Sequence, residues 1–298
     1  MDHVIETREL TKRFGRKSLA VDGLALNVPR GSVFAFLGRN GAGKTTTIRM
    51  LLHLLDKSGG EARVLGLDSV RDALEIKRRV GFVGDGQLMY DWMSVDEMIW
   101  FCKGFYQGWD DAFAAEMKKK LELSGKTKVR ALSRGQQAKL ALLLAMAYRP
   151  ELLILDEPTT GLDVVVRRNF LEGVIELIQE EGRTVFFSSH IVHEVERVAD
   201  WVGIIDNGRL IHCSPLEALK AKVKRLVMTF ETVPADLAER LPSTLLLSEA
   251  GRQASAIVSD FSDDTLAAAR ALGPSRLDVE DLSLEDIFVA MVGHPEEV

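Results

Sequence analysis

The octet Gly38-Arg39-Asn40-Gly41-Ala42-Gly43-Lys44-Thr45 has the residue types and spacing to hold a chain of phosphates. It fits G-x-x-x-x-G-K-[ST], follows a strand-like run at 33–37 and precedes a helix-forming stretch at 46–55. The glycines let backbone N–H groups point at an anion, and the helix adds its positive end. Lys44 would reach the β- and γ-phosphates, and the Thr45 hydroxyl would bind Mg²⁺. The octet therefore predicts a nucleoside triphosphate site.

We assign triphosphate binding to the octet and to the start of the next helix, namely Gly38, Asn40, Gly41, Ala42, Gly43, Lys44, Thr45 and Thr46. An ordinary glycine turn is the alternative, and the intact strand–loop–helix context disfavours it. A dinucleotide-binding G-x-G-x-x-G does not fit, because the glycines fall at 38, 41 and 43.

A second chemical feature is the pair of adjacent carboxylates Asp156 and Glu157, which follows the apolar run 152–155. A continuous apolar run predicts a central strand covered on both faces, and open α/β sheets bind ligands at the carboxyl ends of such strands. We expect Asp156 to hold Mg²⁺ through water and Glu157 to polarise the attacking water.

Length and composition limit the class of protein. A chain of 298 residues has room for one large domain and a small one, and its net charge of −6 argues against a sequence-blind nucleic-acid binder. Cys102 and Cys213 have neither metal-site nor disulfide spacing, which indicates a reducing compartment. The first residues do not form a signal peptide, and no run approaches the ~18–20 apolar residues of a membrane span. We expect a cytoplasmic protein.

The elements that must position these residues alternate between strands and helices up to about residue 222. Expected strands are 5–10, 19–28, 33–37, 80–83, 152–156, 184–188, 201–206 and 210–213; expected helices are 46–55, 95–106, 111–123, 134–148, 164–181 and 191–199. This alternation predicts an α/β domain with a largely parallel sheet, and the early strand pair suggests an antiparallel flank. Turns are expected at Gly59-Gly60, Gly84-Asp85-Gly86 and Asn207-Gly208, the last of which is typical of a hairpin.

The pattern changes after about residue 223. Strands are expected at 225–231, 254–259 and 276–279, and helices at 234–241, 265–272 and 284–292. The prediction is a small C-terminal α+β domain over 223–298, separate from the domain over 1–222.

The segment Leu132-Ser133-Arg134-Gly135-Gln136 resembles the signature motif of ATP-binding cassette (ABC) ATPases. Ser133 has the character of a helix N-cap, and Gly135 lets the backbone approach phosphate. The family usually has a second glycine where Arg134 stands. The resemblance covers roughly residues 4–222. It implies ATP as the nucleotide and a RecA-like P-loop NTPase core with an antiparallel flank and a helical subdomain.

Further matches occur in family order. Gly161-Leu162-Asp163 resembles the D-loop, Ser188-Ser189-His190 resembles the switch-histidine segment, and Phe14 sits where the family stacks an aromatic ring on adenine. The resemblance implies a head-to-tail dimer with ATP between the subunits. On this basis we assign catalysis to Lys44, Glu157 and His190, and nucleotide contacts also to Phe14, Ser133, Gly135, Gln136 and Asp163.

The sequence departs from the family after the run 80–83, where a glutamine normally contacts Mg²⁺ and the attacking water. Our alignment places Asp85 there, with Gln87 two residues later, and either residue could fill the role. A carboxylate is the better ligand for a hard cation but is one methylene shorter. The expected metal ligands are Thr45, Asp85 and Asp156.

The tail Ser283-Leu284-Glu285-Asp286-Ile287-Phe288 is similar to that of cassette subunits of ABC-2-type exporters. It implies an ATPase subunit on the inner face of the membrane, paired with a separate integral-membrane subunit and with a second cassette, identical or different. The aromatic residues between Trp92 and Trp109 would form a docking surface or the core of a helical subdomain. The alternatives are a soluble ABC ATPase acting on ribosomes or nucleic acid, and a regulatory ATP-binding module.

Overall fold

The structure, a computed structural model, describes residues 2–15, 18–86, 89–162, 167, 173 and 182–293. The chain divides into two compact units, Met1–Cys213 and Ser214–Val298. The domain boundary predicted at 222/223 lies beyond helix α8 (Leu216–Lys222), which this division places in the second unit.

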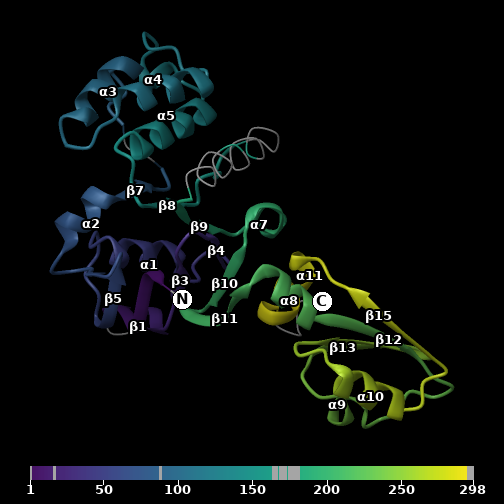
Figure 1. The fold of residues 1–298 in the computed structure, drawn as a ribbon. Helices are drawn as coiled ribbons and strands as arrows, with labels where there is room; N and C mark the ends of the chain where they lie inside the picture. The colour runs from purple at the N-terminus through teal and green to yellow at the C-terminus, as the bar shows by residue number, and fades with distance from the viewer. Residues whose placement is uncertain are drawn as a thin grey trace. The chain divides into compact units, whose positions relative to one another are not determined.

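A six-stranded sheet forms the centre of the first unit, in the order β11-β10-β4-β9-β8-β7 (Figure 1). Its strands are β4 (Val33–Leu37), β7 (Val80–Val83), β8 (Leu152–Asp156), β9 (Thr184–Ser189), β10 (Trp201–Asp206) and β11 (Arg209–Pro215). The pairs from β10 to β7 are all parallel. Every residue of β4, β8 and β9 is buried, as their apolar runs predict for strands covered on both faces.

The parallel order brings the carboxyl ends of β4, β8 and β9 to the same edge of the sheet. Helix α1 (Lys44–Leu51) begins after the loop that follows β4, and α7 (Val192–Val198) begins after β9. Packed phenylalanine rings fill the core beneath this edge: Phe186 lies 5.6 Å from Phe34 and 5.5 Å from Phe36 between ring centroids. The loops that carry the predicted site residues therefore follow strands that are buried in a packed core.

An antiparallel sheet accompanies this core, as predicted. It consists of β1 (His3–Phe14), β2 (Ser18–Leu24), β3 (Asn27–Pro29), β5 (Gly59–Val64) and β6 (Leu67–Asp68). The single strand expected at 19–28 is two strands. The turn expected at Gly59-Gly60 is wrong, because β5 begins there: a Cβ on Gly60 would come within 2.1 Å of the Glu9 carbonyl oxygen, so the glycine permits close approach of β1.

Among the described residues, the segment between β7 and β8 contains α3 (Val95–Lys103), α4 (Asp111–Lys120) and α5 (Arg134–Met146), with a short 3₁₀ helix at Val129–Ala131 before α5. Another short helix, α2 (Ala73–Arg79), precedes β7. Helix α5 contacts α3, α4 and β7. Its link to the core includes the Tyr148 hydroxyl, which donates to the Val80 carbonyl oxygen over 2.9 Å.

The second unit is a four-stranded antiparallel sheet in the order β13-β14-β12-β15. Its elements are α8, β12 (Lys224–Thr229), α9 (Leu237–Arg240), β13 (Thr244–Ala250), β14 (Gln253–Val258), α10 (Asp263–Ala271), β15 (Arg276–Asp281) and α11 (Leu284–Val292). This sheet with its helices agrees with the α+β class predicted for residues 223–298, although strand β13 was not expected. Leu226, Met228 and Ala256 of the sheet share an apolar core with Leu237 and Ala269 of α9 and α10.

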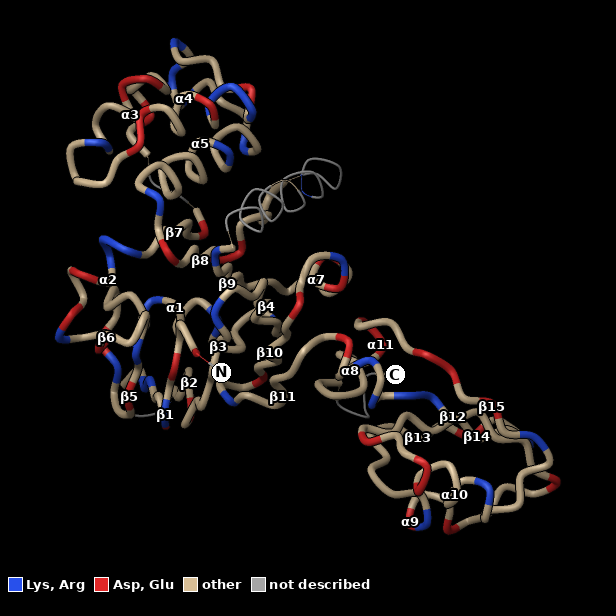
Figure 2. Tube along the Cα trace, viewed as in Figure 1, with Lys and Arg blue, Asp and Glu red and all other residues tan. Residues whose placement is uncertain are grey.

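Acidic and basic residues are interspersed along the trace in both units (Figure 2). No helix among the described residues has both the length and the apolar character needed to cross a bilayer.

Candidate active site

The loop between β4 and α1 has the shape that the octet predicts. Gly43 caps α1 in the left-handed region, at φ 110°, and a Cβ there would lie 2.5 Å from the Ala20 carbonyl oxygen. A Cβ on Gly38 would lie 2.4 Å from the Ile205 carbonyl oxygen. Both positions therefore require glycine, and the loop holds its curve by close backbone contact with β2 and β10.

Lys44 is buried beneath this loop, with only 5% of its residue surface exposed. Its Nζ donates to the carbonyl oxygens of Gly38 (2.6 Å) and Arg39 (3.2 Å). The same Nζ lies 3.1 Å from Oε1 of Glu157. The ammonium group thus joins the loop after β4 to the carboxylate after β8.

Asp156, at the end of β8, connects the start of α1 with the end of β9. Its Oδ1 accepts hydrogen bonds from the Thr45 hydroxyl (3.0 Å) and from the Ser188 hydroxyl (2.7 Å). A hydroxyl and a carboxylate supply the hard oxygen ligands that Mg²⁺ prefers, so this pair fits the predicted cation. Thr45 and Asp156 would hold it.

Burial raises the pKa of Asp156, and the nearby carboxylates of Glu157 and Asp85 act in the same direction, while the hydrogen bonds from Ser188 and Thr45 lower it. A raised pKa means that the folded protein binds this proton more tightly than the unfolded chain does. The free energy of unfolding therefore falls as the pH rises from the ordinary pKa of an aspartic acid through the raised pKa of Asp156, because the carboxyl group ionises more easily in the unfolded chain. A bound cation would offset it by stabilising the carboxylate.

Glu157 lies between two cationic or protonatable groups. Its Oε1 faces Lys44, and its Oε2 lies 2.8 Å from Nδ1 of His190. The side chain is only 11% exposed, and Oε1, although close to Lys44 Nζ, accepts no hydrogen bond from the described residues. A carboxylate fixed in this way, at the edge of the phosphate loop, is placed to accept a proton from an attacking water.

The backbone of Glu157 is in the left-handed region, at φ 48°, which an L-residue adopts at a cost of ~1–2 kcal/mol. Two hydrogen bonds hold it there: Glu157 N donates to the Ser188 hydroxyl (2.9 Å), and Thr160 N donates to the Glu157 carbonyl oxygen (3.1 Å). Backbone strain of this kind is concentrated at functional sites.

The segment that resembles the signature motif forms the N-terminus of α5 by a capping box. The Ser133 hydroxyl accepts from Gln136 N (3.2 Å), and Gln136 Oε1 accepts from Ser133 N (3.0 Å). Both side chains are exposed, so this helix end is open to a partner. Phe14 is also exposed, at 47%, with Lys12 Nζ 5.0 Å from its ring centroid.

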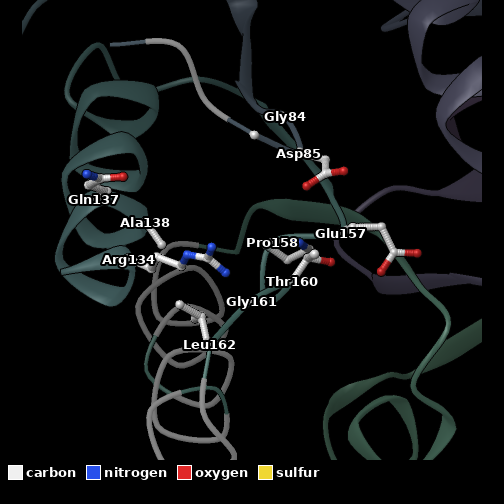
Figure 3. A pocket seen from close by; sticks show the side chains of 11 residues that line it. Gly84, Asp85, Arg134, Gln137, Ala138, Glu157, Pro158, Thr160, Gly161 and Leu162 are labelled. Atoms are coloured by element: carbon white, nitrogen blue, oxygen red, sulfur yellow. The ribbon is translucent and has the colours of Figure 1, made fainter. Parts of the chain in front are cut away.

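A pocket of about 360 Å³ lies beside Glu157 (Figure 3). It is lined by Asp85 after β7, by Arg134 at the start of α5, and by the loop Glu157–Leu162. In Figure 3 the Arg134 guanidinium extends toward this loop, where a Cβ on Gly161 would come 2.7 Å from Nη1. The predicted Asp85 and Glu157 both line this pocket.

The structure therefore joins Thr45 to Asp156 by a hydrogen bond and places Glu157 beside Lys44 and His190, and Ser188 links Asp156 to Glu157. Together these residues form one group. Among the described residues, no hydrogen bond or ion pair joins this group to Ser133, Gly135 or Gln136. Two predicted positions, Asp163 and Gln87, lie outside the described residues. Their roles stay predictions.

Comparison with known proteins agrees with the motifs. The sequence pattern of the family described as "ABC transporter" matches residues 21–160. The bacitracin transport ATP-binding protein BcrA of Bacillus licheniformis is 36% identical over 227 residues, which cover 76% of this chain and 74% of BcrA. The daunorubicin/doxorubicin resistance ATP-binding protein DrrA of Streptomyces peucetius is 34% identical over 311 residues, which cover 98% of this chain and 93% of DrrA. The chain belongs to the ABC transporter ATP-binding proteins.

Solved structures support the same fold. The structure of cbiO1 from Clostridium perfringens, part of the ABC transporter complex cbiONQ, has a TM-score of 0.64 and 25% identity, and the match covers 74% of this chain and 92% of cbiO1. The dimeric post-hydrolysis structure of the cassette MJ0796 bound to ADP and Pi has a TM-score of 0.63 and 22% identity, and the match covers 71% of this chain and 98% of MJ0796. These structures confirm the P-loop NTPase fold, and the family match with its relatives confirms the role as an ATP-hydrolysing ABC subunit.

Sequence reasoning missed two groups that support the site of this ABC ATPase. Ser188 forms hydrogen bonds with both Asp156 and Glu157. The sequence feature that could have indicated it is its position at the end of the expected strand 184–188, which in the structure is the neighbour of β8 and pairs Ser188 with Asp156. The second group is Thr159 with Glu194, which are 35 residues apart and carry no motif of their own.

Proposed function

We propose that this cassette powers export by a separate integral-membrane subunit, using Mg·ATP bound between two cassettes. The observation that carries the ATPase part is the position of Glu157, held between Lys44 and His190 at the phosphate loop. Export is supported by relatives whose names refer to bacitracin transport and to daunorubicin resistance. We place the protein at the inner face of the membrane through its partner.

Hydrolysis needs positioned groups and charge neutralisation more than covalent chemistry. The loop amides and Lys44 would neutralise the γ-phosphate, while Thr45 and Asp156 would hold Mg²⁺, which supplies further positive charge. Glu157 would orient the water and accept its proton. His190 would hold the Glu157 carboxylate in place and stabilise the charge that develops on the γ-phosphate in the transition state.

The exposed N-terminus of α5 supports a site completed by a second cassette. Helix N-termini favour anions, and among the described residues no hydrogen bond or ion pair joins Ser133 or Gly135 to the phosphate loop of their own chain. We infer that they meet the γ-phosphate held by the partner cassette, identical or different. Hydrolysis would then depend on closure of the dimer, and release of phosphate would favour opening.

An apolar groove of about 350 Å³ supports docking of the membrane subunit. Residues from α3, α5, β7 and neighbouring segments line it, among them Phe82, Met98, Tyr106 and Leu144. Trp92, Trp100 and Phe105 of the same region are exposed at 60%, 75% and 69%, whereas Phe101 packs edge-on against Tyr90 and Phe105. The aromatic segment thus contributes both to local packing and to an exposed surface of the kind that partner proteins bind.

Purification from detergent-solubilised membranes tests the proposal. A tagged chain is expected to recover a polytopic membrane protein in stoichiometric amount, and a Trp100→Ala, Phe105→Ala variant is expected to lose it while retaining ATP binding. Recovery of ribosomes or nucleic acid would instead support the soluble ABC ATPase. Recovery of the chain alone would favour the regulatory module.

We also propose that Asp85 takes part in metal binding. Asp85→Ala is expected to raise the Mg²⁺ concentration that gives half-maximal turnover by about tenfold, because the pocket loses a hard oxygen ligand. Gln87→Ala should change it less. ATPase rates measured across a magnesium titration give both numbers, and the reverse ranking would assign the role to Gln87.

A further inference from the structure

We propose that Glu194 is a positioning residue for ATP hydrolysis, acting through Thr159 and Arg167 on the loop that carries Glu157. ATP hydrolysis takes place in the cassette itself, so this role of Glu194 does not depend on export or on the identity of the membrane partner.

Glu194 lies on α7 and is 7% exposed, an unusual position for a carboxylate. Its Oε2 accepts a hydrogen bond from the Thr159 hydroxyl over 3.2 Å, and Thr159 itself is 3% exposed. Its Oε1 lies 3.3 Å from Nε of Arg167. A buried charge needs such partners, because an unpaired one would cost several kcal/mol.

The partners of Glu194 belong to the loop after Glu157. Thr159 is two residues from Glu157, and Leu162 N donates to the Thr159 carbonyl oxygen over 3.1 Å. Arg167 Nη2 donates to the Leu162 carbonyl oxygen over 3.0 Å. One carboxylate therefore fixes the loop at Thr159 directly and at Leu162 through the guanidinium.

The loop after β8 and the segment after β9 also contact each other at Glu157 and His190. Helix α7 starts two residues after His190, and His190 contacts Glu157 over 2.8 Å. The loop after β8 and the segment after β9 are thus joined at both ends, by Glu157–His190 at the exposed end and by Thr159–Glu194 at the buried end. Because Glu157 has a strained backbone, loss of the buried contact would let it relax away from the position that orients water.

The contact between Thr159 and Glu194 would control the position of the Glu157 carboxylate and not the affinity for ATP. Within the described part of the chain, no hydrogen bond or ion pair joins Thr159 or Glu194 to the phosphate loop or to Lys44, so ATP binding should not depend on them. This separates a positioning role from a general structural one, which would change affinity and stability together.

The test compares Thr159→Val, which removes the hydroxyl at similar volume, with Thr159→Ser, which keeps it. Thr159→Val is expected to lower kcat about tenfold with the KM for Mg·ATP within twofold, and Thr159→Ser to restore kcat to within twofold of the original chain. Glu194→Gln, which loses the charge facing Arg167, should also lower kcat at unchanged KM. Glu116→Gln, an exposed carboxylate on α4, serves as the matched control and should have no effect.

Thermal unfolding and calorimetric titration with Mg·ATP accompany the kinetics. A fall in kcat with an intact unfolding midpoint and affinity supports the proposal, as does rescue by Thr159→Ser. It is overturned if Thr159→Val and Glu194→Gln turn over at the original rate. It is also overturned if affinity, midpoint and kcat fall together, which would make the contact a feature of stability alone.

Discussion

Replacing Glu157 by glutamine is expected to lower ATP turnover by at least about a hundredfold and to leave Mg·ATP binding within about threefold. Glutamine has the same length and can still contact Lys44 and His190, which hold the side chain at 3.1 and 2.8 Å. It cannot accept a proton at neutral pH, and removal of a general base costs 10²–10⁴-fold in rate. Steady-state phosphate release and calorimetric titration measure the two quantities on the same preparation.

Glu116→Gln provides the comparison, because its carboxylate forms only a surface pair with Lys120 on α4. It should hydrolyse ATP at the original rate. A Glu157→Gln protein with near-normal turnover would show that another group accepts the proton, and the geometry around His190 would then need a different explanation. A loss of ATP binding together with turnover would indicate that the substitution had disturbed the phosphate loop.

The parts of the site that sequence alone predicted are contiguous in the chain. The glycines at fixed spacing predict the phosphate loop after β4. The apolar run that ends in Asp156-Glu157 predicts a strand with two carboxylates at its end. In both cases the site residues follow the carboxyl end of a strand, and the strands are parallel neighbours of β9. The predicted residues Lys44, Thr45, Asp156 and Glu157 therefore meet at one edge of the sheet.

The parts that sequence did not predict depend on which strands are neighbours. Ser188 supports Asp156 only because β9 pairs with β8 in a register that sets these two residues opposite each other. Glu194 supports Thr159 for the same reason. Strand β13 was missed because its alternation is interrupted, with a register shift between Thr244 and Leu246, and β5 because its Gly59-Gly60 start resembles a turn.

Replacing Lys44 by methionine is expected to weaken Mg·ATP binding by at least about a hundredfold and to abolish measurable turnover at millimolar ATP. Methionine keeps an apolar stem in the buried site but removes the ammonium group that would contact the phosphates. A charge-assisted contact is worth ~1.5–3 kcal/mol, and Lys44 would contact both the β- and the γ-phosphate, so its loss would cost ~3 kcal/mol or more. Because tenfold in affinity corresponds to about 1.4 kcal/mol, this is at least about a hundredfold. Calorimetric titration measures the change, and Lys119→Met, an exposed lysine of α4, is the matched control.

The same substitution should also lower stability, because it leaves the buried Glu157 carboxylate beside an apolar group. Breaking a buried pair on one side costs more than removing both charges. Lys44→Met is therefore expected to lower the unfolding midpoint by several degrees, and Lys44→Met combined with Glu157→Gln to recover part of that loss without recovering ATP affinity. The double variant separates the two roles of Lys44. If it regained affinity, the weak binding of the single variant would come from the unpaired carboxylate, and the phosphate loop would not need its lysine to hold ATP.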